Sequence, residues 1–271
     1  MTEKILNQAE KREENEHFSD LVIFTTTLYG EDKTSLVRLE LAKKLFANAE
    51  KLGIKCVVLD NGSSKNFLQE VAKYKNVKLI IQPAFGMGEG RRRSLQEAMQ
   101  MVSPEIKNPN FLWTEPEKDG LITKENLNAM INGLRNGSVD IVVPQRKNKD
   151  SYPKFQARIE TRANKRAKEL GGMSQDFPNE EIDLWFGPKM FNLTGAQYFL
   201  DYKGKLDKWD AIIKPVINAY KDGKTIGVTP VDFTYDQSQR KDEEGNKEFK
   251  KKRFEQYVKI LEELDDKQED A

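Results

Sequence analysis

The chain has 271 residues, 33% of them charged and 37% hydrophobic, which suffices for one large domain or two small ones that bury about three quarters of the unfolded surface. Its 45 basic and 44 acidic residues give a net charge of +1, and this balance argues against a dedicated nucleic-acid-binding protein. One cysteine, Cys56, excludes an intramolecular disulfide, and because there is neither a signal-peptide core in 1–20 nor an apolar run near the ~20 residues of a membrane span, we expect a soluble, cytoplasmic protein.

The first half of the chain alternates between predicted strands and helices. A polar N-terminal arm at 1–19 precedes segment 21–28, whose continuous apolar start is typical of a strand buried on both faces of a parallel sheet. A helix over 34–52 follows, with leucines on one side and Gly53 behind it. The alternation continues with strands at 54–59, 77–81, 110–114 and 139–143 and helices near 64–74, 89–101 and 124–135.

Short connections between these elements predict an α/β fold, a doubly wound and mostly parallel sheet flanked by helices. In such sheets ligands bind beyond the carboxyl ends of the strands. The second half predicts helices at 154–170, 209–220 and 247–264 and a strand at 225–232. Since no Pro/Gly-rich linker interrupts the chain, we expect a single domain over 20–264 with a C-terminal helical extension, followed by a charged tail at 265–271.

Polar turns follow the predicted strands. After the second strand comes Asp60-Asn61-Gly62-Ser63-Ser64, in which Asp60 can accept hydrogen bonds from a base or ribose and Gly62 makes a tight turn. Turns of this composition are also ordinary helix starts, with serine as the cap. The motif alone therefore favours a structural turn over a ligand site.

A glycine–arginine motif, Gly86-Met87-Gly88-Glu89-Gly90-Arg91-Arg92-Arg93, follows the third strand and opens a helix. Glycines expose backbone N–H groups at a helix start, where anions bind well. Consecutive arginines there repel one another and oppose the helix dipole, a conflict that a phosphate between them relieves. We expect Gly86, Gly88, Arg91 and Arg92 to hold a phosphate; the alternative is a solvated basic edge.

Two carboxylates, Glu115 and Glu117, follow the fourth strand in Trp113-Thr114-Glu115-Pro116-Glu117-Lys118. Residues two apart in an extended segment face the same side. Such a pair can bind a divalent cation such as Mg²⁺ or Mn²⁺ through oxygen ligands, and the cation can bridge a diphosphate. The alternative is a loop that forms a salt bridge to Lys118.

His17 is the only histidine and lies in the polar arm, so acid–base chemistry falls to other side chains. The segment Asn179–Pro188 offers carboxylates, and Asp183, next to aromatic residues, is a candidate base or acceptor-binding group. Trp185 and Phe186 can stack on a sugar or form part of the core, and the core is the interpretation that we favour. The basic run Lys250–Arg253 is interpreted as a solvated helix face rather than a phosphate site.

The arrangement as a whole resembles the family-two-like glycosyltransferases of the GT-A fold over about residues 20–190. The resemblance implies that Thr25, Thr26, Thr27 and Asp60 hold a nucleotide. It also implies that the acidic pair takes the place of the family's Asp-x-Asp metal site, although glutamate is longer than aspartate. Inverting members of the family use a later carboxylate as a base, which points to Glu180, Glu181 or Asp183, and no motif selects one of the three.

The resemblance predicts a glycosyltransferase that moves a sugar from a nucleotide-diphosphate sugar to an unidentified acceptor. Two alternatives stay open. A sugar-phosphate nucleotidyltransferase also uses an α/β sheet and a glycine–arginine loop, but usually after the first strand. A non-catalytic nucleotide-sugar-binding protein of the same fold is the other, because the acidic pair departs from the family's pattern.

Overall fold

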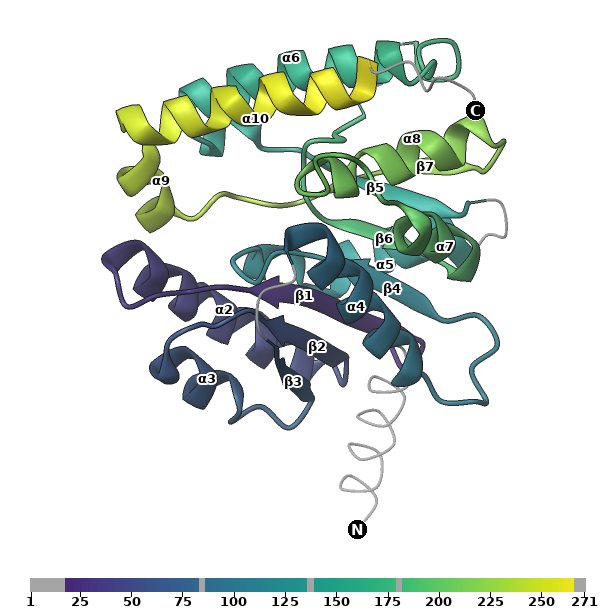
Figure 1. Cartoon of the computed structure of the whole chain (residues 1–271). Helices are drawn as coiled ribbons and strands as arrows, with labels where there is room; N and C mark the ends of the chain where they lie inside the picture. Colours follow the sequence, from purple (N-terminus) through teal and green to yellow (C-terminus); the bar gives the residue numbers. More distant parts are fainter. Residues whose placement is uncertain (1–17, 83–85, 136–138, 179–181, 266–271) are drawn as a thin grey trace.

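A computed structural model describes residues 18–82, 86–135, 139–178 and 182–265 (Figure 1). Its sheet has seven strands in the order β3-β2-β1-β4-β6-β5-β7. The strands are β1 (Leu21–Thr27), β2 (Lys55–Asp60), β3 (Val77–Ile81), β4 (Asn110–Trp113), β5 (Ile141–Arg146), β6 (Lys189–Phe191) and β7 (Ile226–Val231). The pairings place β6 antiparallel to both of its neighbours and the other strands parallel to one another. The predicted mostly parallel α/β sheet is therefore confirmed.

Helices cover both faces of the sheet. They are α2 (Lys33–Lys51), α3 (Lys65–Val71), α4 (Met87–Gln100), α5 (Lys124–Arg135), α6 (Lys154–Leu170), α7 (Leu193–Asp201), α8 (Lys214–Lys221), α9 (Gln237–Glu243) and α10 (Lys247–Asp265), with the short 3₁₀ turns η1 (Asp119–Leu121), η2 (Lys149–Ser151) and η3 (Asp210–Ile212). Alternate residues of β1 enter different cores, because successive side chains of a strand point to opposite faces. Ile23 packs with α2, α3 and α5, and Phe24 packs with α4, α7 and α8.

The C-terminal helix crosses back toward the first half of the chain. Figure 1 shows α10 lying alongside α6, with α9 leading into it from β7. Phe18, within the predicted polar arm, is buried, and residues 1–17 lie outside the described part of the chain. At the other end, Asp265 is the last residue of α10 and the rest of the predicted tail is not described.

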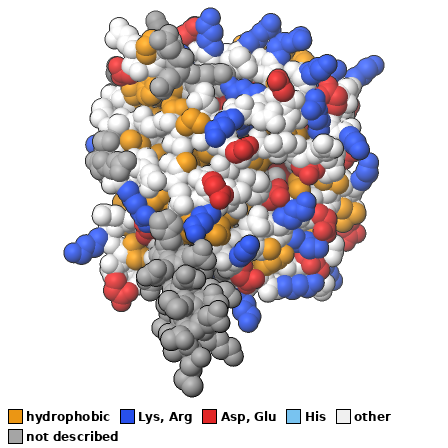
Figure 2. All heavy atoms as spheres, turned by 180° about the vertical axis from the view of Figure 1, so that it is seen from behind, with side chains coloured by type: hydrophobic (Ala, Val, Ile, Leu, Met, Phe, Trp, Pro, Cys, Tyr) orange, Lys and Arg blue, Asp and Glu red, His pale blue; other side chains and the backbone are white. Residues whose placement is uncertain are grey.

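One face of the molecule carries charges of both signs. Figure 2 shows acidic and basic side chains interspersed over the face opposite to that of Figure 1. Within the described residues, no helix has the length and apolar composition that crossing a bilayer requires. The cytoplasmic location stays a prediction.

Candidate active site

A cleft of about 460 Å³ opens where β1 and β4 end. Parallel strands present their carboxyl ends at one edge of a sheet, and this edge is where the fold accommodates ligands. The lining residues come from the end of β1 and the loop after it, α2, the turn after β2, the start of α4, the end of β4 and the loop after it, the loop before η3, and α10: Thr26, Thr27, Leu28, Tyr29, Arg38, Asn61, Gly86, Met87, Arg91, Trp113, Glu115, Pro116, Glu117, Lys208, Trp209, Phe249, Lys252, Arg253 and Gln256.

The predicted nucleotide residues at the ends of β1 and β2 divide into two groups. Thr26 and Thr27 line the cleft, whereas Thr25 is buried. Asp60 is fully buried, and its carboxylate accepts hydrogen bonds from the Thr27 hydroxyl (2.7 Å) and from the backbone N–H groups of Gly62 (2.9 Å) and Ser63 (2.8 Å). Asp60 thus fixes the turn and orients Thr27, and Asn61 is the residue of this turn that lines the cleft.

The two glutamates after β4 both line the cleft, but their environments differ. Glu117 accepts a hydrogen bond from the Tyr29 hydroxyl (2.5 Å) and lies 3.8 Å from Arg38 Nε. The Oε2 atom of Glu115 is buried and has no hydrogen-bond partner within the described residues. Buried carboxylate oxygens are rarely left without a partner, so Glu115 is the one of the pair whose surroundings call for a ligand.

Lys118, which follows this pair, is enclosed by aromatic rings. Its Nζ lies 5.5 Å from the ring centroid of Tyr152, 5.8 Å from Phe186, 5.5 Å from Phe233 and 5.1 Å from Tyr235. Burial alone lowers the pKa of Lys118, but the nearby Tyr152 and the glutamates raise it on balance. Lys118 is therefore a fixed cation, which anchors the loop that carries the glutamates and offsets part of their charge.

The start of α4 is largely occupied by the chain itself. Gly86 lines the cleft, but the Gly88 N–H donates to the backbone carbonyl of Asp207 (2.9 Å). A Cβ added at Gly88 would lie 1.9 Å from Asp207 Oδ1, so only glycine permits this contact. The expectation that Gly88 offers its N–H to a phosphate does not fit this arrangement, because the loop before η3 already uses that N–H.

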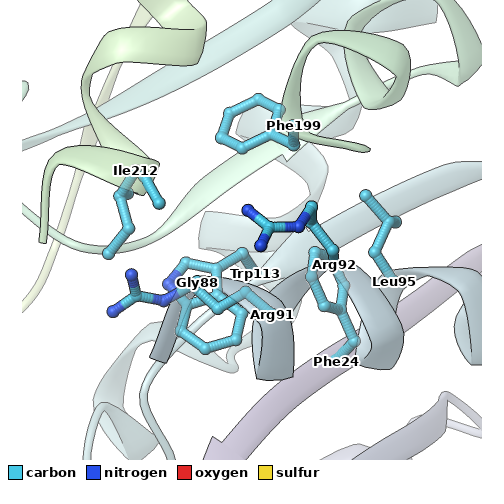
Figure 3. Close-up of a pocket in the computed structure, with 9 residues that line it drawn as sticks. Phe24, Gly88, Arg91, Arg92, Leu95, Trp113, Phe199 and Ile212 are labelled. Carbon is cyan, nitrogen blue, oxygen red and sulfur yellow. The ribbon is translucent and has the colours of Figure 1, made fainter. Parts of the chain in front are cut away.

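Arg91 and Arg92 leave α4 in different directions (Figure 3). Arg92 is buried and forms a bidentate ion pair with Asp207 (2.7 and 2.8 Å), with further hydrogen bonds to Glu89 and to the Tyr202 carbonyl. Arg92 therefore positions a loop and is not available to a phosphate in this arrangement.

Arg91 lines the cleft, with its guanidinium 5.0 Å from the ring centroid of Trp113. One Nη donates to the carbonyl of Lys208, while the buried Nε has no partner within the described residues. Burial lowers the pKa of Arg91 to about 10, so the side chain is still charged at neutral pH. Of the two arginines that the sequence predicted as phosphate ligands, Arg91 is the one that faces the cleft.

The catalytic role predicted for Asp183 does not fit its position. Asp183 is fully buried outside the lining of the cleft, with hydrogen bonds from Arg146 (2.6 and 2.7 Å) and Asn164 (2.8 Å). Burial alone raises the pKa of this carboxyl, but the Arg146 guanidinium lowers it on balance. A carboxylate tied in this way holds Arg146 instead of taking a proton from a substrate, and Glu181 lies outside the described residues.

Trp185 and Phe186 show why the segment after Asp183 matters for shape. Phe186 is buried in the core, as favoured from the sequence, while Trp185 is half-buried and lines a side pocket of about 70 Å³ next to the cleft. Arg91 and Glu115 line this side pocket as well. The cleft therefore has a smaller extension beside the unpartnered Glu115 oxygen.

Lys189 holds the loop that contains Trp185 and Phe186 through hydrogen bonds to its backbone. Its buried ammonium donates to the carbonyls of Leu184 (3.2 Å), Phe186 and Pro188 (3.2 Å). Burial lowers the pKa of Lys189 to about 7. This role could not be predicted from the sequence, because lysine is ordinarily a surface residue.

Several residues that line the cleft were not identified as site residues from the sequence. Arg38 of α2, Lys208 and Trp209 of the loop before η3, and Lys252 and Arg253 of α10 all face it. Only Lys252 and Arg253 belong to a motif that the sequence displays, and that basic run was assigned to solvent. Helical periodicity shows which side of a helix is apolar, but it does not show which polar side faces a cleft.

The residues present fit a divalent cation in a limited way. The described residues contain no group of three or more His, Cys, Asp or Glu side chains arranged to hold a metal ion. Hard cations such as Mg²⁺ are nevertheless often held by one or two carboxylates together with substrate phosphates and water. Glu115, with its unpartnered oxygen, fits that pattern. Glu117 fits it if the cation replaces its hydrogen bond from Tyr29 and its ion pair with Arg38.

Solved structures share this fold at low sequence identity. Mannosyl-3-phosphoglycerate synthase from Rubrobacter xylanophilus matches with a TM-score of 0.57 and 10% identity, over 95% of this chain and 79% of that chain. Glucosyl-3-phosphoglycerate synthase from Mycobacterium tuberculosis, in complex with Mn²⁺, UDP-glucose and phosphoglyceric acid, matches with a TM-score of 0.54 and 11% identity, over 90% and 79%. A complex of the same enzyme with Mg²⁺ and UDP matches with a TM-score of 0.52 and 12% identity, over 80% and 71%.

No protein-family model matches the sequence, and no curated protein matches it. At such identities the matches show the fold alone. The chain has the GT-A-like fold of nucleotide-sugar transferases, as its sequence motifs predicted.

Proposed function

We propose that the protein transfers a sugar from a nucleotide-diphosphate sugar to an acceptor. The observation that carries the proposal is the cleft at the ends of β1 and β4, where Glu115 and Glu117 lie with basic side chains around a space suited to a small ligand. A diphosphate and a divalent cation together match this distribution of charge. The solved structures of the same fold include complexes with UDP and Mn²⁺ or Mg²⁺, which supports the same ligand class.

Each group of residues has a chemical task in this proposal. Thr26, Thr27 and Asn61 bind the nucleoside side of the donor, with Thr27 oriented by Asp60. Glu115 holds the cation, which when bound would act as a Lewis acid on the diphosphate. Arg91 stabilises the charge that grows on the diphosphate as the sugar leaves.

Proton transfer has few candidates among the described residues. Asp183 is tied to Arg146, and the carboxylates lining the cleft are the two glutamates of the acidic pair. We therefore assign Asp183 a positioning role in place of the catalytic one, while the predicted role of Glu181 stays a prediction.

Product analysis tests the proposal. Incubation with UDP-glucose or GDP-mannose, Mn²⁺ and a set of acceptors should release the nucleoside diphosphate and a glycosylated product. Release or consumption of pyrophosphate would identify a nucleotidyltransferase instead. Tight binding of the nucleotide sugar without turnover by any acceptor would favour the non-catalytic binding protein.

A further inference from the structure

We infer that α10 presents an anion-binding face to the cleft, formed by Lys252 and Arg253 with Arg38 of α2, and that this face holds a phosphate group of the ligand. Identifying the phosphate as part of a nucleotide rests on the proposed function. The anion site itself rests on the charges, burial and contacts of these side chains.

The charge balance of the cleft favours an anion. Among the described residues, its lining contains the basic side chains Arg38, Arg91, Lys208, Lys252 and Arg253 but only the acidic side chains Glu115 and Glu117. A concave surface with an excess of one sign attracts ligands of the other sign. The excess remains after Glu117 is counted as the partner of Arg38.

The basic side chains on α10 are close enough to repel one another. Burial lowers the pKa of Lys252 first, and the positive charges of Arg253 and Arg38 lower it further, against an opposing effect of Glu243. Arg253 donates to the neutral side chain of Gln256 (3.1 Å) and lies 5.0 Å from the Phe249 ring centroid. An anion placed among these like charges relieves their repulsion.

Arg38 adds a second, independent indication. Its Nε is buried and makes no hydrogen bond within the described residues, and the Glu117 oxygen that pairs with it is 3.8 Å away. Buried donors normally have an acceptor, and the planar guanidinium group is well suited to phosphate oxygens. The face thus has an unused donor as well as an excess of charge.

The start of α4, where the sequence predicts the phosphate, differs in this respect. Its Gly88 N–H is bonded to Asp207, and Arg92 is paired with the Asp207 carboxylate. The charge of Arg92 is thus balanced by the protein itself. Within the described part of the chain, Lys252 and Arg253 form no such ion pair with a carboxylate, and Arg253 donates only to the neutral Gln256 side chain.

Calorimetry on side-chain variants tests the inference. Arg253→Met and Lys252→Met remove the charge while keeping an unbranched stem, and Lys251→Met is the matched control, an exposed lysine on the same helix that does not line the cleft. The probes are inorganic pyrophosphate and UDP, GDP or ADP. We expect Arg253→Met to weaken pyrophosphate binding about ten- to a hundredfold, the factor for losing a hydrogen bond to a charged group, with no change for Lys251→Met.

The outcomes separate the source of the phosphate. Parallel loss of pyrophosphate and nucleoside diphosphate binding assigns the face to the diphosphate of the donor. If nucleoside diphosphate binding is unchanged but inorganic phosphate binds the nucleotide-saturated variant more weakly, the face holds the phosphate of a second ligand.

Pyrophosphate binding that depends on Arg253, without binding of any nucleoside diphosphate, keeps the anion site and removes the proposed function. Affinities unchanged in both Arg253→Met and Lys252→Met, or an equal loss in Lys251→Met, overturn the inference. Melting curves without ligand check that each variant is folded, and Lys252→Met provides the test if Arg253→Met does not fold.

Discussion

Two adjacent arginines on α4 illustrate how differently neighbouring side chains are used. Arg91 lines the cleft, where it stacks on Trp113, whereas Arg92 is buried against Asp207. Successive helical residues point about 100° apart, so the two side chains meet different surroundings. The sequence places both at a helix start, but only the packing of the loop before η3 decides which of them is free to bind.

Replacing Arg92 by alanine tests its structural role. The substitution leaves the Asp207 carboxylate without its bidentate partner, and because that carboxylate is partly exposed, we expect the free energy of unfolding to fall by about 2 kcal/mol, less than for a fully buried ion pair. Arg93→Ala, at a half-exposed position next to it, should change stability by less than about 0.5 kcal/mol. Urea unfolding measures both, and equal small losses would contradict the assignment.

A second prediction concerns the positive charge of Lys118. Lys118→Met keeps the aromatic enclosure filled but removes the cation beside Glu115 and Glu117. The carboxylates should then attract a divalent cation more strongly, so the Mn²⁺ concentration for half-maximal UDP binding should fall roughly three- to tenfold. Lys118→Arg, which retains the charge, is the control. A purely structural lysine would leave the Mn²⁺ dependence unchanged.

At the scale of elements, Lys189 connects the short strand β6 to the loop before it. The lysine ammonium is bonded to carbonyls of that loop, and Gly187 in the loop packs against Glu115: a Cβ added there would lie 2.1 Å from Oε1. The position of the Glu115 carboxylate therefore depends on the conformation of 184–188. A buried cation that orders a loop also links the stability of the fold to pH.

The pH dependence follows from where this proton is bound. Burial lowers the pKa of Lys189 to about 7 in the folded protein, against about 10.4 in an unfolded chain. Between these values the unfolded chain binds more protons, so the contribution of Lys189 to stability should rise as the pH rises from about 7 toward 10. Unfolding at pH 7, 8 and 9 should show wild type gaining stability relative to Lys189→Met. A difference that is constant or shrinks with pH would refute this.

Some of the strands and helices could be predicted from the sequence and others could not. Apolar runs such as Val22–Phe24 identified β1, β2, β4 and β5, because a strand buried on both faces needs a continuous apolar run. The strands β3 and β7 were identified from apolar runs as well, although most of their residues are not fully buried. The strand β6 was missed, since three residues that include a buried lysine give no such signal. The short helices α7 and α9 were also missed. For α9 the reason is that the segment is polar almost throughout.

Site residues divided along the same lines. Thr26 lies at the end of β1, and Glu115 and Glu117 come just after β4, so the sheet topology alone brings them to the cleft. Asp183 follows no strand, and its sequence context does not reveal that Arg146, 37 residues away, pairs with it. Contacts of this kind depend on packing between distant segments and are not a property of either segment alone.

At the scale of the whole molecule, the cleft is assembled by both ends of the chain. Thr26 and Arg38 come from the first strand and helix, and Arg253 and Gln256 come from the last helix, which lies beside α6 (Figure 1). A protein that retained only the first half of the chain would lack the basic side chains that α10 contributes to the cleft, Lys252 and Arg253. The C-terminal extension therefore belongs to the site that we propose.

The most direct test of the account is the binding of nucleoside diphosphates measured by calorimetry with and without Mn²⁺, on wild type and on Glu115→Gln. We predict that at least one of UDP, GDP and ADP binds wild type, that Mn²⁺ strengthens this binding, and that the gain from Mn²⁺ is lost in Glu115→Gln while the variant melts as wild type does. If none of the three diphosphates binds, or if the gain from Mn²⁺ is unchanged without the Glu115 charge, the cleft is not the nucleotide-sugar site described here.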